Sequence, residues 1–259
     1  DEINESALKE AKLISIYNCN FYLRYPLWHV DTVHIKDSTF FESARGPLWY
    51  SKKISIFNSK FDSPKLLREC EIVDIYHTSM VSNEIFWKCK NIEIRHSVIE
   101  GEYAFFESKN INIKDLKFKG KYSFQYVDKL IIKDSELDTK DAFWHATNVE
   151  VTNCVLKGEY LGWYSNNLTL RNCKIISHQP LCYCSNLNLI DCELIDSDCS
   201  FENSEVDAII TNEITSVRKI KKGKITEVTG DPTETAIVAA AKMSSAASIS
   251  SANMSLWGL

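Results

Sequence analysis

Short aliphatic pairs recur at a nearly constant interval along the chain. Ile, Val or Leu stands at eleven such positions, and in ten of the eleven cases a second one follows two residues later. Successive pairs are 19 residues apart, with a single interval of 21 residues. Apolar residues at alternate positions predict a short strand with one buried face. The pairs begin at Ile14, Val33, Ile54, Val73, Ile92, Ile111, Leu130, Val149, Leu168, Leu187 and Val206.

The length of this period predicts the fold class. Nineteen residues are too few for a strand, a full helix and their loops, so each repeat is expected to contain only strands and turns. Such units stack and hydrogen-bond in parallel, at about 4.8 Å per coil. The sequence therefore predicts an all-β fold, a single-stranded right-handed parallel β-helix of about 10–11 coils of 19 residues. We expect residues 1–230 to form this domain, and the Ala/Ser-rich residues 231–259 to form a helical cap or a disordered tail.

A polar position four residues after the start of each pair marks a corner of the coil. Eight of the first ten repeats have Asn or Asp there, and the other two have His77 and His96. Asn and Asp tolerate left-handed backbone and bond their own turn. A row of turn residues is not a set of converging oxygen ligands, so we expect no metal site and no cofactor.

Three columns of residues precede each strand, by six, five and four positions. The third column contains too many charges to face a core, so it is expected to point outward. Strict alternation then turns the middle, Trp-rich column inward and the first, Leu/Phe-rich column outward. A soluble monomer rarely exposes such an apolar stripe, so we expect it to bind a protein partner or a second copy of the chain. The alternative is a bend that buries both columns in part. The candidate interface comprises Leu48, Leu67, Phe86, Phe105, Phe124 and Phe143.

The outward column contains a row of aromatic and titratable residues, which is a second candidate site. Such rows can stack on sugar rings, so an oligosaccharide is the ligand expected there, with Glu107 as the best-placed acid. The alternative is an ordinary solvated strand face. The candidate ligand-binding face comprises Glu107, Tyr126, His145, Tyr164 and Tyr183.

Composition and charge exclude several classes of protein. The 259 residues include 30 Lys and Arg against 35 Asp and Glu, a formal charge of −5, so we expect no nucleic-acid partner. The sequence has no apolar run of about 18 residues, so we expect no membrane span. The nine cysteines lack a CxxC pair, which favours a reducing, cytoplasmic location. The cysteines at 154, 173 and 192 stack on successive coils and are expected to be small buried thiols.

Two local strings carry a resemblance to a known family. The string GEYLGWYS at residues 158–165 and the string KDAFW at residues 140–144, together with the columns, resemble DUF3737, an uncharacterised bacterial family known only as a domain of unknown function. The resemblance spans about residues 7–225 and implies membership of the pectin-lyase-like right-handed β-helices. It implies no assigned activity, so it supplies no catalytic residues.

The wider superfamily contains polysaccharide lyases and glycoside hydrolases, whose chemistry makes demands on the sequence. A hydrolase needs two carboxylates about 5–10 Å apart on one outward face. Glu69 and Glu107 have that spacing, but Lys88 between them would hold both ionised and remove the general acid. We therefore expect a non-catalytic binding or scaffold protein that uses a side face for protein–protein or self association. The alternative is a carbohydrate-binding or carbohydrate-active protein.

Overall fold

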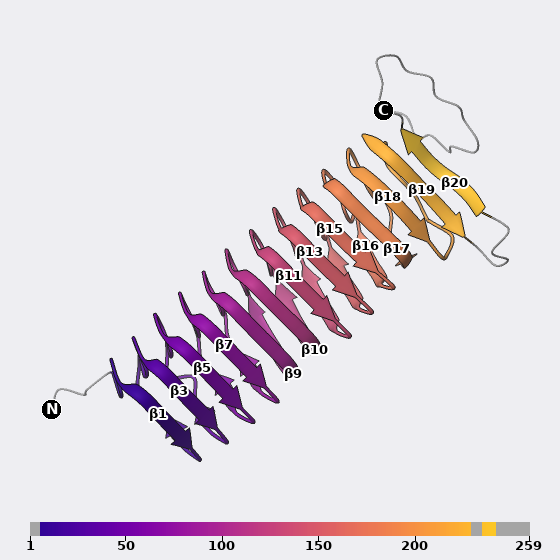
Figure 1. Ribbon diagram of the computed structural model, residues 1–259. Helices are drawn as coiled ribbons and strands as arrows, with labels where there is room; N and C mark the ends of the chain where they lie inside the picture. Colours follow the sequence, from indigo (N-terminus) through magenta and orange to yellow (C-terminus); the bar gives the residue numbers. More distant parts are fainter. Residues whose placement is uncertain (1–5, 229–234, 242–259) are drawn as a thin grey trace.

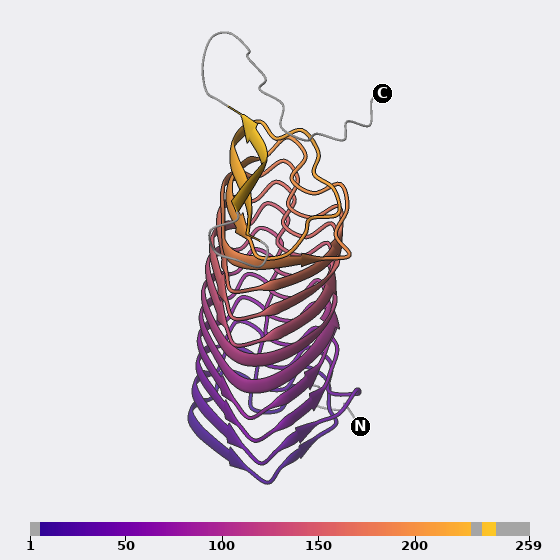
Figure 2. The same cartoon turned by 90° about the vertical axis from the view of Figure 1, so that its right-hand side faces the viewer.

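The chain forms an elongated stack of coils. The computed structural model describes residues 6–228 and 235–241, and all the regular structure in them is β-strand (Figure 1). Figure 2 shows each coil lying above the one before it, with the strands of one face in line. The predicted parallel β-helix of about eleven 19-residue coils is confirmed.

Two strand faces run the length of the stack. Strands of the first face are β1 (Lys12–Tyr17), β3 (Asp31–Lys36), β5 (Lys52–Phe57), β7 (Glu71–Tyr76), β11 (Asp128–Lys133), β13 (Thr147–Thr152), β15 (Asn166–Arg171) and β18 (Glu205–Ile210). Strands of the second face are β2 (Asn20–Phe21), β4 (Thr39–Phe40), β6 (Lys60–Asp62), β8 (Ser79–Val81), β12 (Glu136–Lys140), β14 (Val155–Glu159) and β16 (Lys174–His178). Three longer strands cross from one face to the other, namely β9 (Lys90–Glu102), β10 (Lys109–Lys121) and β17 (Ser185–Ile195).

The register follows the aliphatic pairs. Ile14 of β1 pairs with Val33 of β3, which pairs with Ile54 of β5, and the same parallel register continues to β18. The core is therefore a set of columns in which one residue type stacks on itself. Phe40 and Phe61, for example, are fully buried and stack with their ring centroids 4.3 Å apart. In-register stacking of this kind explains why the sequence repeats so regularly.

The Leu/Phe column lies in the core, so the predicted exposed interface was wrong. Each of its six residues is at most 1 % exposed, and Phe105 stacks on Phe86 and Phe124 with centroids 4.7 Å apart on both sides. The six are Leu48, Leu67, Phe86, Phe105, Phe124 and Phe143. The alternative, a bend that buries both columns in part, describes the structure better than an exposed stripe does. The difference is that the Leu/Phe column is fully buried and only the Trp column is half-buried.

Left-handed backbone is the physical reason for that error. In one typical coil Tyr103, Phe105 and Glu107 have φ of 54°, 63° and 54°, so the chain turns there and the alternation of an extended strand does not apply. Hydrogen bonds between coils hold this conformation. The amide of Phe105 donates to the carbonyl of Ile85 on the preceding coil (2.8 Å), and that of Glu107 donates to the carbonyl of Gln125 on the following coil (3.0 Å).

The polar corners agree with the sequence-based expectation. The Asn, Asp and His residues of this column have positive φ, from 44° at Asn58 to 55° at Asn153. Neighbouring side chains also form amide ladders, as where Nδ2 of Asn172 donates to Oδ1 of Asn153 at 2.9 Å. The described residues include no group of three or more His, Cys, Asp or Glu placed to hold a metal ion.

The C-terminal end differs from the expected helical cap. Strand β19 (Lys222–Val228) continues the parallel stack on β18, and β20 (Thr235–Ala241) pairs antiparallel with β19. The helical alternative is therefore wrong for residues 235–241, because the unpaired edge of β19 offers backbone partners that outweigh the helix preference of alanine. The rest of the tail lies outside the described residues. Within the described part of the chain, no helix is long and apolar enough to cross a membrane.

The stacked cysteines match the expectation of small buried thiols. Cys154, Cys173 and Cys192 are at most 2 % exposed, and all are free thiols. Each donates weakly to a backbone carbonyl, as Cys173 does to Arg171 at 3.2 Å. Their side chains fill a buried corner that other coils fill with serine, threonine or, at Leu116, leucine.

Candidate functional site

Four side chains on the outer corner form a continuous stack, which we call the aromatic ladder. It comprises Tyr126, His145, Tyr164 and Tyr183. Each follows the Leu/Phe column in a turn before a strand of the first face, and each has φ between 53° and 60°. The amide of each donates to a carbonyl on the next coil, as His145 does to Trp163 at 3.0 Å. The same turns that bury the Leu/Phe column therefore point the ladder outward.

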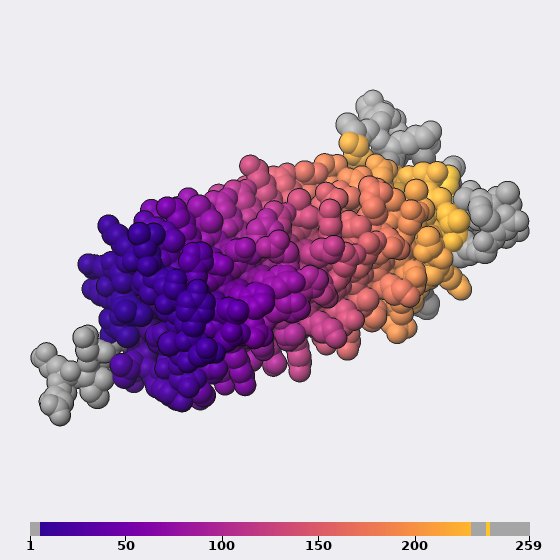
Figure 3. All heavy atoms as spheres, turned by 60° about the horizontal axis from the view of Figure 1, so that its bottom comes forward, coloured from indigo at the N-terminus to yellow at the C-terminus, as the bar shows by residue number. Residues whose placement is uncertain are grey.

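The rings of the ladder lie nearly parallel. Centroids of successive rings are 5.0, 5.1 and 5.0 Å apart, with interplanar angles of 9°, 8° and 14°. Tyr126 and Tyr164 are 48 % and 44 % exposed, His145 is exposed and Tyr183 is half-buried. The predicted row thus exists as a contiguous surface feature. Figure 3 shows the elongated surface formed by successive coils.

Two tryptophans support the ladder from behind, a role that the sequence did not reveal. Trp144 and Trp163 were expected to face the core, but they are half-buried and stack on each other at 5.6 Å. Their indole N–H groups donate to the carbonyls of Tyr160 and Gln179 on the following coil, at 2.9 and 2.8 Å. Their ring systems also meet the ladder edge to face, as Trp163 meets Tyr183 at 5.5 Å and 72°. These contacts brace Tyr164 and Tyr183 from the inner side.

The fifth predicted site residue, Glu107, lies below the ladder and belongs to an ion pair. One oxygen of its carboxylate is 3.6 Å from Nζ of Lys88, and both side chains are about half exposed. The carboxylate of Glu107 is thus engaged by a neighbouring lysine and does not stack with the rings of the ladder. At the other end, removal from water raises the pKa of the Tyr183 phenol, and the carboxylate of Glu202 raises it further.

The geometry of the ladder limits the ligands it can bind. A sugar ring stacks on the face of an aromatic ring, yet the inner faces here are covered by the neighbouring rings at 5.0–5.1 Å. The exposed parts are ring edges, tyrosine hydroxyls and imidazole nitrogens. Such groups suit the mixed apolar and hydrogen-bonding contacts of a protein surface.

The structure also has a shallow hollow, but it lies elsewhere. A depression of about 430 Å³ lies on the outer side of the first strand face and is lined by Asn112, Lys129, Ile131, Asn148 and Glu150 among others. No ladder residue lines it. A polar, open depression on a flat sheet lacks the enclosure that small-molecule sites usually have.

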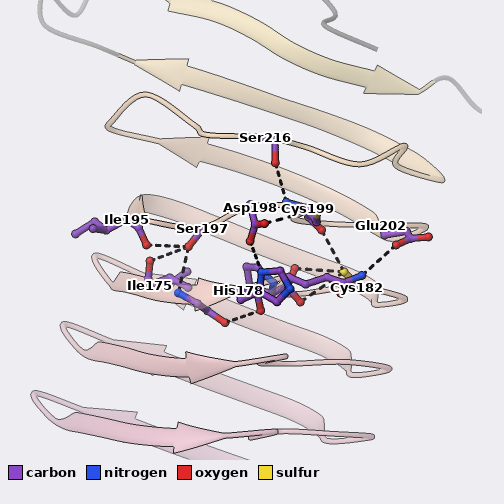
Figure 4. Close-up of polar contacts among 12 residues, drawn as sticks. Ile175, His178, Cys182, Ile195, Ser197, Asp198, Cys199, Glu202 and Ser216 are labelled. Carbon is purple, nitrogen blue, oxygen red and sulfur yellow. Dashed lines mark hydrogen bonds and ion pairs between the residues drawn. The ribbon is translucent and has the colours of Figure 1, made fainter. Parts of the chain in front are cut away.

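A further cluster lies where the last regular coil meets residues 196–204. Figure 4 shows His178 pointing toward Asp198, with Nδ1 and Oδ1 2.5 Å apart, and Cys182 lying beneath Cys199. Oδ2 of Asp198 is 3.9 Å from Sγ of Cys199, and the side chain of Glu202 accepts a hydrogen bond from Gln179 at 3.3 Å. The sequence did not indicate this cluster, because its members come from different columns of neighbouring coils.

Comparisons with known proteins identify a family without an assigned activity. No curated protein matches the sequence. Among solved structures, the surface adhesin PfbA of Streptococcus pneumoniae is similar with a TM-score of 0.41 and 9 % identity, over 85 % of this chain and 74 % of the adhesin. QnrB1, a plasmid-mediated fluoroquinolone resistance protein, is similar with a TM-score of 0.21 and 12 % identity, over 76 % of this chain and 91 % of that protein. A sequence model of the family DUF3737 matches residues 2–249, so the chain belongs to this family of proteins of unknown function.

Proposed function

We propose that this protein is a non-catalytic β-solenoid that binds through its aromatic ladder, and that its partner is a second copy of the chain. The observation that carries the proposal is the ladder itself, four stacked rings that project from one corner. Tyr and Trp are enriched among the residues that dominate binding energy at protein interfaces, because they bury much apolar area and still form hydrogen bonds. Bracing by the tryptophans lowers the entropy lost on binding.

The spacing of the rings favours a partner with the same period. Successive rings are 5.0–5.1 Å apart, close to the coil spacing of a parallel stack. A partner engages all four rings in the same way only if its own surface repeats at that interval. A second copy of this chain meets the condition without further assumptions, and a two-fold arrangement would set ladder against ladder.

Light scattering after size-exclusion chromatography tests the proposal. The 259-residue protein is expected to be a dimer at micromolar concentration, and the double variant Tyr126→Ser/Tyr164→Ser to be a monomer, with a dissociation constant raised about a hundredfold. Tyr17→Ser is the matched control, because Tyr17 is 55 % exposed on β1, far from the ladder. Circular dichroism confirms that all variants are folded. A monomeric wild-type protein, or a double variant that remains dimeric, would overturn the proposal.

The alternative of carbohydrate binding, suggested by the pectin-lyase-like resemblance, has less support from the geometry because the ring faces are covered. It makes a separate prediction. Soluble oligosaccharides at millimolar concentration would raise the melting temperature of the wild-type protein but not that of the double variant. An unchanged melting temperature with a broad panel of uronate, hexose and amino-sugar oligomers would count against this alternative.

A further inference from the structure

The nine cysteines differ sharply in their access to solvent. Seven are at most 3 % exposed, and only Cys19 and Cys199 can be reached from outside. Cys19 has no thiol beside it on the neighbouring coil, since its amide donates to the hydroxyl of Ser38 at 3.1 Å. Cys199 does have one, because Sγ of Cys182 lies 3.6 Å from its carbonyl oxygen. Accessibility and a neighbouring thiol therefore coincide only at Cys199 among the described residues.

Charged groups surround the Cys199 thiol. Besides the carboxylate of Asp198 at 3.9 Å, Arg218 is nearby, and its interaction with Cys199 raises the pKa of the guanidinium. The amide of Cys199 donates to Oγ of Ser216 at 2.8 Å, which ties this residue to the segment that carries Arg218 (Figure 4). Solvent access is a condition for a cysteine to react with an oxidant, and Cys199 meets it.

From this arrangement we propose that Cys199 is a peroxide-sensitive thiol which, once oxidised, forms a disulfide with Cys182 on the neighbouring coil. This inference does not depend on the aromatic ladder. Cys182 is fully buried, and burial raises the pKa of its thiol to about 12. Because a buried, protonated thiol reacts slowly with an oxidant in solution, Cys182 is not the first of the two to be oxidised. Cys199 is the site of oxidation and Cys182 is the thiol that resolves it.

The chemistry balances with a hydroperoxide as the oxidant. Sulfur of Cys199 attacks one peroxide oxygen, so that an S–O bond forms, the O–O bond breaks and a sulfenic acid remains. With hydrogen peroxide the thiol proton passes to the leaving oxygen, which departs as water. The Cys182 thiol then attacks the sulfenic sulfur, forming the S–S bond and releasing a second water. Two thiols are oxidised by two electrons and one peroxide is reduced to two waters.

The surrounding backbone is irregular enough to allow closure. A disulfide requires sulfur atoms about 2 Å apart. At present the sulfur of Cys182 contacts the carbonyl oxygen of Cys199, so the Cys199 side chain must turn toward Cys182 before the bond can form. Strand β17 ends at Ile195, and the pairing of β17 with β18 shifts register between Leu189 and Cys192. The hydroxyl of Ser200, directly after Cys199, is buried without a hydrogen-bond partner. A segment that lies outside the regular strands and contains a buried hydroxyl without a hydrogen-bond partner can adjust at a lower cost than the regular coils below it.

Peptide mapping tests the pair. The full-length protein is treated with hydrogen peroxide under native conditions, the remaining thiols are alkylated, and the digest is analysed by mass spectrometry. The expected result is loss of the alkylated Cys199 and Cys182 peptides, with a linked peptide that disappears on reduction. Cys19 is the internal control, and it is expected to remain alkylated because it lacks a resolving thiol.

Two variants keep the proposal falsifiable. In Cys182→Ala the reaction should stop at the sulfenic acid of Cys199, which a 1,3-diketone reagent traps. In Cys199→Ser no linked peptide should form, and Cys182 should stay reduced. The proposal is overturned if Cys199 remains alkylated in the treated wild-type protein, if Cys19 is oxidised as fast as Cys199, or if the diketone adduct is absent from Cys182→Ala.

Discussion

Replacing Phe124 by alanine decides whether the Leu/Phe column is core or interface. Phe124 is fully buried and stacks between Phe105, at 4.7 Å, and Phe143, at 5.3 Å, with Phe118 tilted against it at 5.7 Å. Removing a buried phenylalanine side chain costs about 3–5 kcal/mol, from lost burial and from the cavity left behind. Coils above and below are held in register by their own hydrogen bonds, so the cavity can close only in part. The upper part of that range, about 4–5 kcal/mol, is therefore expected.

Urea unfolding followed by circular dichroism measures this loss. The matched control is Phe57→Ala, because Phe57 is 38 % exposed on the outer side of β5, where it contacts Tyr76, His77 and Lys36 on the surface. The control is expected to lose less than about 1 kcal/mol, whereas Phe124→Ala should also lower the melting temperature by about 10 °C. Since a solenoid can unfold in parts, the midpoint and the slope are compared together. Two results would refute the assignment of Phe124 to the core. One is an equal loss of unfolding free energy in the two variants, and the other is a Phe124→Ala protein of unchanged stability whose oligomeric state alone differs.

Two further predictions follow from the corners. Gly158→Ala is expected to lower stability by about 2 kcal/mol or more in the same urea assay. The reason is that φ of Gly158 is +152° and an added Cβ would lie 2.2 Å from the carbonyl oxygen of Thr139. Unchanged stability would contradict this close approach. Asp141→Asn is expected to be more stable than the wild type at neutral pH. Burial raises the pKa of Asp141, with Lys140 opposing and Glu159 reinforcing the shift, so its contribution to stability is lost as pH rises above the ordinary value of 3.8. The gain in melting temperature should vanish near about pH 3, and a gain that is independent of pH would contradict it.

The fold could be predicted from the sequence because stacked coils need the same kind of residue at the same position in every coil. Alternate aliphatic residues mark the strands, and Asn or Asp marks the corner where the backbone is left-handed. The aromatic ladder followed from the same reasoning, since its residues share one outward column. The strands and the polar corners were predictable because their residue types have a local preference for the conformation that they adopt.

The corner at the Leu/Phe column was not predictable on those grounds. Leucine and phenylalanine have no preference for left-handed backbone, yet Leu48 and Phe124 have φ of 61° and 57°. Their conformation is set by hydrogen bonds to the neighbouring coils, such as that from the amide of Phe124 to Ala104 at 2.8 Å. Sequence reasoning that assumes an extended chain therefore placed the Leu/Phe column outside and the Trp column in the core, and both placements were wrong. The cluster around Cys199 could not be predicted from the sequence for a related reason. Its residues belong to different columns and meet across an irregular coil.

The same backbone feature connects the core and the proposed binding surface. A left-handed residue at Phe143 buries its ring, and a second one at His145 turns the imidazole outward two positions later. Between them Trp144 lies half-buried and bonds the carbonyl of Tyr160 on the next coil. Any change that relaxes this turn must therefore disturb the stacked phenylalanines and the ladder together. A substitution such as Phe143→Ala should weaken association as well as stability, whereas Tyr164→Ser should weaken association alone. If Phe143→Ala lowers stability without weakening association, the geometry of the ladder does not depend on the core beneath it.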